Sequence, residues 1–442
     1  KSSVRLKTIE GEKMLAAKTP LSFREMKQLT SHLPPCEDSM ISTLTTQEGW
    51  ELLQKYPHPC QLEAPMIAKQ LRKRYPAALV ASLQTQWILR EKAQIKLGDE
   101  AKNKLFTREG LEQASRKIVS IQRAKRFTDA GIDTLIDVGC GIGADSMQLA
   151  SSCQQLRAVD ISPTAATCAA LNLSEIPSAQ VYCESAQQVT IQNPLPALFF
   201  DPARRLPTGR ALSPDSWSPP LSKVLAWGGR ASHLAVKMAP GIDLSYLPDN
   251  YHAQWVSVDG DLVECALYSL NLAPEGAGRS ALIIQGNQVK EYLCASASRP
   301  GDNHVQVPPA SGLGDYLFDP NPAIIRAGII PDLCEKILAA PIANGIAYLS
   351  GNSMPLPEDS LATTCYRIVE DLPLKTKTVS SYLRTIQATR LDVLKRGVIL
   401  DIASWRKKVM PKKTRGFSPR TVTVALTRVG AGHRCLVLEP CK

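Results

Sequence analysis

A short apolar run that leads straight into three closely spaced glycines decides which class of fold this chain can adopt. The run at residues 134–138 continues into Asp137-Val-Gly-Cys-Gly-Ile-Gly143. Glycines let the backbone turn tightly and approach a ligand with no Cβ in the way. A helix is expected to begin near Ala144, and its first N–H groups favour negative charge. A strand, a glycine turn and a helix in this order indicate an open α/β sheet with a ligand site at the turn.

From Ile132 onward, short β-rich runs alternate with helical stretches. This alternation predicts a parallel sheet with helical crossovers. Asp259-Gly260-Asp261 predicts a turn between strands at 255–258 and 262–270, so the sheet is expected to end in an antiparallel hairpin. That ending, and a glycine spacing that differs from G-x-G-x-x-G, disfavour a nicotinamide-dependent oxidoreductase. The expected parallel strands are Thr134–Val138, Leu156–Val159, Gln180–Cys183, Ala197–Phe200 and His233–Lys237.

The length of 442 residues leaves room for several domains. We expect an all-helical N-terminal domain over 1–125 and a Rossmann-like α/β domain over 126–272. A small α+β domain follows over 280–350, with a ferredoxin-like arrangement as one option, and another over 360–442. In the first domain, residues 22–25 predict a capping box. Residues 105–127 predict an amphipathic basic helix, with Ile118, Ile121 and Ala124 inside and Arg123 at the surface.

Composition limits the kinds of partner. The net charge of +11 and the pI near 9.0 favour a polyanionic partner, with a merely basic soluble protein as the alternative. No apolar stretch approaches the ~18–20 residues of a membrane helix, and the N-terminal residues do not resemble a secretory leader. The twelve cysteines include no C-x-x-C pair, so no metal site is expected and a reducing cytoplasm fits best.

Two carboxylates are expected at strand tips. Asp160 ends the second strand, where it is placed for ribose hydroxyls; the alternative is that it caps the next helix. Asp201 ends the fourth strand and is followed by Pro202, which restricts the backbone. Asp201 is expected to hold an amine or a ring nitrogen there. Arginines beyond it form a cationic rim for phosphates, and Trp217 either stacks on a base or lies in the core. The rim consists of Arg204, Arg205 and Arg210.

These motifs together resemble the class I S-adenosylmethionine (SAM) dependent methyltransferases. A bacterial subgroup with a helical N-terminal region and a THUMP-like C-terminal domain is more closely similar. The resemblance covers about residues 100–440. It is carried by Asp201-Pro-Ala-Arg-Arg205, Ser218-Pro-Pro220, Val236-Lys-Met-Ala-Pro-Gly241, Trp255-Val-Ser-Val-Asp-Gly-Asp261, Asp319-Pro-Asn-Pro-Ala-Ile-Ile-Arg-Ala-Gly328, Arg390-Leu391 and Lys395-Arg-Gly397. The resemblance implies that residues 126–272 are the methyltransferase domain and 360–442 the THUMP-like domain.

The resemblance also implies roles for single residues. SAM is expected to contact the glycine turn and the tip of the second strand, and Asp201 is expected to serve the methyl acceptor. The usual acid after the third strand is replaced by Ser185, so Glu184 or a backbone group is expected to meet the adenine. The expected SAM contacts are Asp137, Gly139, Cys140, Gly141, Gly143, Asp160, Ile161, Glu184 and Ser185.

Basic residues near the C-terminus are consistent with the RNA binding that THUMP-like domains suggest, although a solvated basic loop is the alternative. They include Lys395, Arg396, Arg406, Lys407, Lys408, Lys412, Lys413, Arg415 and Arg420, and Lys237 is expected to contact substrate as well. The sequence therefore predicts a SAM-dependent methyltransferase acting on a base nitrogen in tRNA or rRNA. The alternatives are a non-catalytic SAM-binding RNA-binding or assembly protein, and a small-molecule methyltransferase. Uracil C5 transfer is disfavoured because no cysteine nucleophile follows Lys237.

Overall fold

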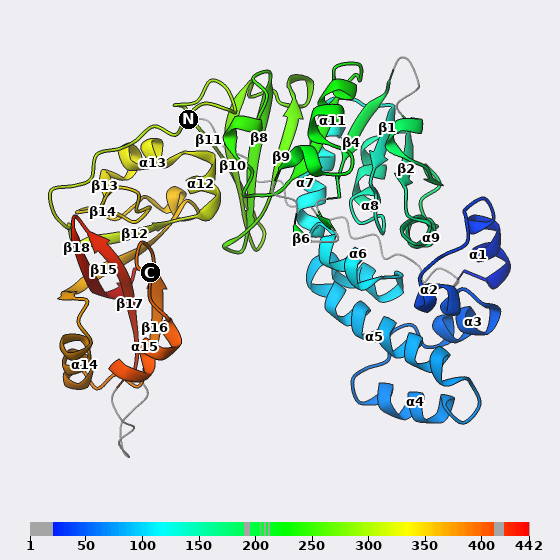
Figure 1. Cartoon of the computed structure of the whole chain (residues 1–442), viewed down its shortest axis with the longest axis horizontal. Coiled ribbons are helices and arrows are strands. Elements are labelled where there is room, and N and C mark those ends of the chain that lie inside the picture. Colours follow the sequence, from blue (N-terminus) through cyan, green and yellow to red (C-terminus); the bar gives the residue numbers. More distant parts are fainter. Residues whose placement is uncertain are drawn as a thin grey trace, which may run out of the picture. The chain divides into compact units, whose positions relative to one another are not determined.

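The structure, a computed structural model, describes residues 21–189, 195–203, 205–206, 209–210, 213–410 and 420–441. The chain divides into two compact units, 1–192 and 193–442 (Figure 1). No described helix is long and apolar enough to cross a membrane. All twelve cysteines lie in the described residues and none forms a disulfide.

Seven α-helices open the described part of the first unit. They are α1 (Phe23–Thr30), α2 (Ser39–Leu44), α3 (Gln47–Lys55), α4 (Glu63–Leu71), α5 (Ala77–Leu97), α6 (Arg108–Gln113) and α7 (Lys117–Asp129). The capping box is confirmed, because Ser22 and Glu25 each accept from the other's backbone N–H. Helices α4 and α5 are separate, since Pro76 disfavours helical backbone at the residue before it.

The face expected for α7 was right for Ala124 and wrong for Arg123 and Ile121. Arg123 is buried, together with Val119, Ala124 and Phe127, whereas Ile121 is 38% exposed. The apolar spacing alone indicated the opposite assignment, because a buried arginine is rare unless it has a partner. Here the Arg123 guanidinium pairs with the carboxylate of Asp145.

Three strands follow in the first unit; they are parallel, as predicted, and lie in the order β1-β2-β3. The remaining elements of this unit are β1 (Thr134–Val138), α8 (Ser146–Leu149), β2 (Gln155–Asp160), α9 (Pro163–Asn172), β3 (Ala179–Cys183) and α10 (Ala186–Val189). The helical region and the glycine turn share one hydrophobic core, in which Leu83 and Trp87 of α5 lie with Ile142 and Cys168. Asn172 reinforces it by donating to the carbonyls of Leu105 and Ile142, both at 2.9 Å.

The second unit begins with strands in the order β11-β10-β8-β9-β7-β4. Strand β7 is parallel to β4, and β8 and β9 form the predicted hairpin, with Asp259 and Gly260 at positive φ in its turn. The sheet does not end there, because β10 adds in parallel to β8 and β11 pairs with β10. The elements are β4 (Ala197–Phe200), β5 (Arg205–Leu206), β6 (Gly209–Arg210), α11 (Leu221–Gly228), β7 (Leu234–Met238), β8 (Tyr251–Val258), β9 (Asp261–Ser269), β10 (Gly278–Gln285) and β11 (Gln288–Leu293).

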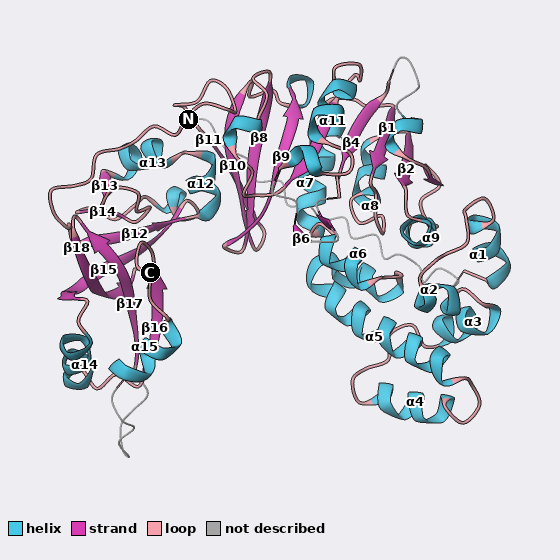
Figure 2. Ribbon diagram, viewed as in Figure 1, coloured by secondary structure: helices cyan, strands magenta, loops and turns pink. Residues whose placement is uncertain are grey.

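A seven-stranded sheet in the order β13-β14-β12-β15-β18-β17-β16 follows in the same unit (Figure 2). It joins strands from both small domains expected over 280–350 and 360–442, a pairing that strand patterns alone do not specify. Helices α14 and α15 contact each other and cover one face with Val379, Leu383, Trp405 and Val409. The elements are β12 (Tyr316–Pro320), α12 (Pro322–Ala327), α13 (Ile330–Ile337), β13 (Ala339–Pro341), β14 (Leu349–Gly351), β15 (Thr363–Pro373), α14 (Thr376–Thr385), β16 (Arg390–Lys395), α15 (Ile402–Val409), β17 (Thr421–Val429) and β18 (Gly432–Pro440).

Candidate functional site

The glycine turn after β1 has the backbone that its sequence predicts. Gly139, Gly141 and Gly143 have φ of 82°, 55° and 81°, values that side chains with a Cβ rarely adopt. A Cβ built at Gly141 would meet nothing within 4 Å, so open space lies in front of this residue. Cys140 is buried, and burial, followed by the Asp160 and Asp137 carboxylates, raises the pKa of its thiol. Cys140 is therefore a neutral packing residue and not a nucleophile.

The turn is held by a buried polar cluster at its far end. Asp145 accepts hydrogen bonds from Ser115 and Ser120, each at 2.7 Å, and pairs with Arg123. Helix α8 begins at Ser146, two residues later than expected, and has only four residues. Its dipole is therefore weaker than predicted.

Asp137 is fully buried and accepts from the hydroxyl of Ser146 at 2.5 Å. Asp137 was expected to contact SAM, and this bond occupies one of its carboxylate oxygens. The chain folds back after Gly143, and the start of α8 brings Ser146 onto the carboxylate. Asp137 thus fixes the shape of the glycine turn.

Asp160 lies at the tip of β2 and links two loops. Its Oδ2 accepts from the N–H of Gly141 and its Oδ1 from the N–H of Ser162, both at 2.9 Å. The N-cap of α9 is Ser162, whose hydroxyl accepts from Ala165, so Asp160 is not the helix cap. A carboxylate offers about four lone-pair positions, which leaves acceptor capacity for hydroxyl groups. The next residue, Ile161, is 71% exposed and adds an apolar surface.

The residues expected to meet an adenine have local partners. Glu184 pairs with Arg157, whose guanidinium lies 4.6 Å from the ring centroid of Tyr182. The hydroxyl of Ser185 hydrogen-bonds to Gln188 at 2.9 Å, at the start of α10. The N–H of Glu184 donates to the carbonyl of Asp160 at 3.0 Å, which holds this segment beside the tip of β2.

In the second unit, Asp201 and Lys237 form an ion pair at the tips of β4 and β7. Lys237 Nζ donates to Asp201 Oδ2 at 2.7 Å, and their side chains are 5% and 22% exposed. The register explains the pair: Phe200 lies opposite Val236 in parallel strands, so the following residues are level. Sequence reasoning named both residues but did not pair them, because the strand register was unknown.

The segment after Asp201 is held by a two-way backbone bridge. Ala203 and Ser218 exchange N–H···O bonds of 2.9 and 3.0 Å, which joins the Asp-Pro segment to the Ser218-Pro-Pro motif. Pro202 is buried. Trp217 is 4% exposed, so burial excludes the expected base stacking and supports the alternative of a core aromatic. Arg204 lies outside the described residues, as do the side chains of Arg205 and Arg210 in β5 and β6.

Only part of the predicted C-terminal basic patch lies in the described residues. Arg406, Lys407 and Lys408 are exposed on α15, whereas Lys412, Lys413 and Arg415 fall outside. Arg396 was wrongly placed in this patch: it donates to Asp319 at 2.7 Å and lies 5.2 Å from the ring centroid of Tyr348. Helix α14 contributes three exposed basic residues that the sequence analysis did not include. They are Lys375, at its N-cap, Lys377 and Arg384.

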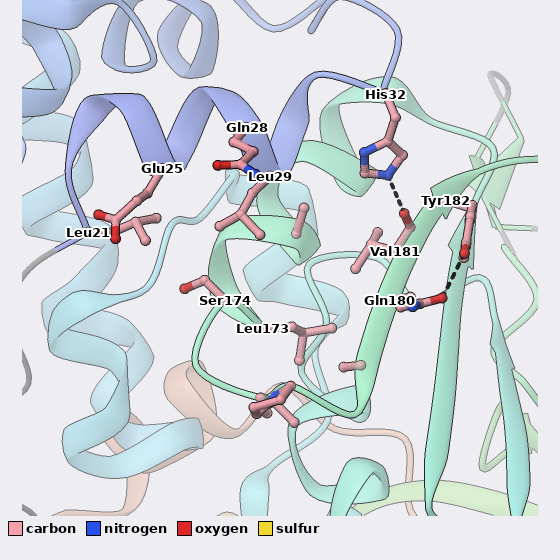
Figure 3. A pocket seen from close by; sticks show the side chains of 14 residues that line it. Leu21, Glu25, Gln28, Leu29, His32, Leu173, Ser174, Gln180, Val181 and Tyr182 are labelled. Atoms are coloured by element: carbon pink, nitrogen blue, oxygen red, sulfur yellow. Dashed lines mark hydrogen bonds between the residues drawn. The ribbon is translucent and has the colours of Figure 1, made fainter.

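A cavity of about 750 Å³ lies beside β3, between α1 and α9, and none of the predicted site residues lines it (Figure 3). His32 reaches across its end and hydrogen-bonds to the carbonyl of Val181 at 2.8 Å. The rings of His32 and Tyr182 pack edge to face, with 6.0 Å between their centroids. The carbonyl that β3 would otherwise leave unpaired at its outer edge is satisfied in this way.

Comparisons with known proteins agree on the class. Residues 363–440 match the family model described as THUMP domain-like. Two proteins from Mycobacterium tuberculosis strains, each named an uncharacterized S-adenosylmethionine-dependent methyltransferase, are 28% identical over 355 residues. The matches cover 78% of this chain and 92% of theirs. A solved structure of a putative methyltransferase from Porphyromonas gingivalis has the same fold, with a TM-score of 0.65. It is 17% identical, and the match covers 87% of this chain and 100% of that one.

The chain is thus similar to S-adenosylmethionine-dependent methyltransferases over most of its length, and its C-terminal segment is THUMP-like. The predicted fold class, an α/β Rossmann-like sheet with helical and α+β additions, is confirmed by the shared fold and by the strand pairing. The match to the THUMP-like model runs from the first strand of the segment, β15, to the last, β18.

Proposed function

We propose that this protein is a methyltransferase that uses SAM to methylate a base nitrogen in RNA, either tRNA or rRNA. The observation that carries the proposal is the Gly141–Asp160 link, in which a glycine turn at positive φ is tied to a carboxylate at the next strand tip. Such a turn and carboxylate bind the nucleoside part of nucleotide cofactors in open α/β sheets. The names of the two mycobacterial relatives support SAM as that cofactor.

The residues of the first unit fit SAM. The open space in front of Gly141 leaves room for the amino-acid portion, and Asp160 keeps acceptor capacity for ribose hydroxyls. The exposed Ile161 offers an apolar face for adenine. In this proposal Gly139, Cys140 and Gly143 shape the turn, Asp137 acts through Ser146, and Glu184 and Ser185 contribute through the backbone beside Asp160. Bound SAM supplies an electrophilic methyl group on its sulfonium.

The Asp201–Lys237 pair fits the acceptor side. Asp201 accepts a hydrogen bond from an exocyclic or ring N–H and so directs the nitrogen lone pair toward the incoming methyl. Pro202, the Ala203–Ser218 bridge and the ammonium of Lys237 together hold this carboxylate in one orientation. Lys237 is therefore a positioning residue for Asp201. It is too deeply buried to be an independent phosphate contact, with 5% of its side chain exposed.

The THUMP-like domain supports RNA as the substrate class. Helices α14 and α15 are held to the sheet by apolar contacts and expose basic side chains to solvent. The exposed basic residues are Lys377, Arg384, Arg406, Lys407 and Lys408. Exposed cations on adjoining helices neutralise phosphates, and each phosphate contact makes binding more sensitive to salt. The sequence alone adds six basic residues to this proposal: Arg204, Arg205, Arg210, Lys412, Lys413 and Arg415.

Calorimetry with SAM and with NAD tests the cofactor, and transfer of a labelled methyl from SAM to total RNA tests the reaction. We expect SAM to bind and NAD to show no heat. Asp201→Ala should abolish transfer while leaving the dissociation constant for SAM unchanged. Binding of SAM by the wild-type chain without transfer to any RNA would favour the non-catalytic alternative. Transfer of the methyl group to small molecules only would favour a small-molecule methyltransferase.

A further inference from the structure

A second cavity, of about 390 Å³, lies in the second unit and belongs to none of the features described so far. Its walls combine apolar side chains with a few polar and charged groups. It is lined by Ile242, Asp243, Leu244, Ser245, Trp255, Gly301, Asn303, His304 and Arg326. A cavity of this size and mixed lining is typical of sites for small organic ligands.

The register of the sheet places this cavity near the tip of β7. Met238, the last residue of β7, lies opposite Cys265, and Cys265 lies opposite Trp255. The indole N–H of Trp255 donates to the carbonyl of Pro240 at 3.0 Å, so the loop that follows β7 is fixed at that level. Strands β7 and β8 are separated by β9, which corresponds to about 10 Å at the usual strand spacing. Trp255 is therefore level with the tip of β7, two strands away, and its side chain lies on the face of Met238 and Cys265, opposite to that of Lys237.

Arg326 is the cation of this cavity. It comes from α12, inside the Asp319–Gly328 motif, and no hydrogen bond or ion pair in the described part of the chain engages its guanidinium. A Cβ built at Gly241 would lie 3.6 Å from Arg326 Nη2, its only neighbour within 4 Å outside the adjoining residues. The guanidinium thus points toward the loop that follows β7.

The other polar groups supply both donors and acceptors. Oδ1 of Asp243 accepts from the N–H and the hydroxyl of Ser245, at 2.9 and 2.7 Å, and these bonds lower the pKa of the carboxyl. Asn303 is exposed at the rim. Nε2 of His304 is buried and has no hydrogen-bond partner among the described residues. The cavity therefore offers hydrogen-bond donors from Arg326 and Asn303 and acceptors from Asp243 and Asn303, beside apolar walls. These groups suit a planar base that has donor and acceptor edges and is attached to a phosphate.

We propose that this cavity binds a nucleotide of the RNA substrate other than the methylated one, with its phosphate or base edge on Arg326. This inference rests on the proposed function and gives it a second contact for the acceptor strand. A bare anion site would not need the apolar surface of Ile242, Leu244 and Trp255. An arginine engages phosphates and the acceptor edges of bases with paired N–H donors.

The first test measures binding of 5′-nucleoside monophosphates and of inorganic phosphate to the full chain by calorimetry. Saturating S-adenosylhomocysteine keeps the cofactor site closed to them. We expect at least one nucleotide to bind, and Arg326→Gln to weaken it about tenfold, the usual size of a lost charge-assisted hydrogen bond. Lys223→Gln, an exposed cation of α11 outside the cavity, is the matched control and should leave binding unchanged.

A second pair of variants adds bulk at Gly241, beside the guanidinium of Arg326, and leaves Arg326 itself unchanged. Gly241→Leu should weaken the same nucleotide about tenfold. Gly241→Ala should have little effect, because the added methyl makes ordinary contact with Nη2 and the φ of Gly241 is not positive. The proposal is overturned if no nucleotide binds, if Arg326→Gln equals the wild type, or if phosphate binds as tightly as every nucleotide.

Kinetics with RNA separates this proposal from the broader one. Arg326→Gln should raise KM for RNA by about tenfold and leave the dissociation constant of SAM unchanged. If the wild-type chain methylates RNA and Arg326→Gln has the same KM, the nucleotide site is wrong and the RNA methyltransferase stands. If the wild-type chain methylates no RNA, the proposed function is wrong whatever the nucleotide titration shows.

Discussion

Replacing Arg123 by methionine should destabilise the first unit by about 3–5 kcal/mol, the usual result of removing one partner from a buried ion pair. The side chains of Arg123 and Asp145 are 1% and 8% exposed, so solvent cannot compensate the carboxylate that is left behind. Two hydroxyl donors, Ser115 and Ser120, remain on Asp145. They reduce the loss but do not supply a countercharge.

Native-state hydrogen exchange on peptides from α7 and β1 is the suitable assay, because it reports the free energy of local opening in a chain of two units. A loss of about 3–5 kcal/mol corresponds to a rise of the open fraction by roughly two to four orders of magnitude. Lys125→Met is the matched control, since Lys125 is exposed on the same helix. It should change the free energy by less than about 0.5 kcal/mol.

A second variant tests whether the charge is the cause. In the double variant Arg123→Met with Asp145→Leu, the buried carboxylate is removed together with its partner, so most of the lost stability should return. A loss below about 1 kcal/mol in Arg123→Met, equal to that of the control, would refute the reasoning. So would a double variant as unstable as the sum of its single changes, because contacting charges are expected to be non-additive.

Three further outcomes are expected. Lys237→Ala should lower kcat by about 10- to 100-fold at unchanged SAM affinity, with partial recovery in Lys237→Arg, because Asp201 loses its orientation; single-turnover methyl transfer measures this. Changing Arg406, Lys407 and Lys408 together to glutamine should reduce the salt slope of RNA binding by about 2, measured by titration at several salt concentrations. Burial, followed by Arg279, lowers the pKa of His304. Its stabilisation is therefore present above about pH 6.5 and is lost as the pH falls through the lowered value. Between pH 7 and pH 5, the melting temperature of His304→Gln should fall by less than that of the wild type.

Local patterns in the sequence were enough to predict the strands and the turns. The runs at 134–138 and 197–200 are strands with those bounds, and Asp259-Gly260 is the hairpin turn. Apolar runs flanked by turn residues specify such elements without reference to the rest of the chain. The glycines of the turn were predicted for the same reason, since positive φ is a local requirement.

Pairings between distant segments could not be predicted. Nothing in the spacing of α7 shows that Arg123 faces inward, because its partner Asp145 lies 22 residues away in the glycine turn. The contact of Arg396 with Asp319 bridges 77 residues, and the addition of β10 to β8 depends on sheet register. Such pairings are set by tertiary packing, which overrides the local preference of each segment. They account for the wrong placement of Arg123 and Ile121 on α7 and for the wrong assignment of Arg396.

Mass spectrometry of nucleosides from cells with and without this protein tests the central claim most directly. The account predicts that one N-methylated nucleoside in tRNA or rRNA disappears without the protein. It should return with the wild-type chain and not with Asp201→Ala. Identical nucleoside profiles in the presence and absence of the protein would contradict the account.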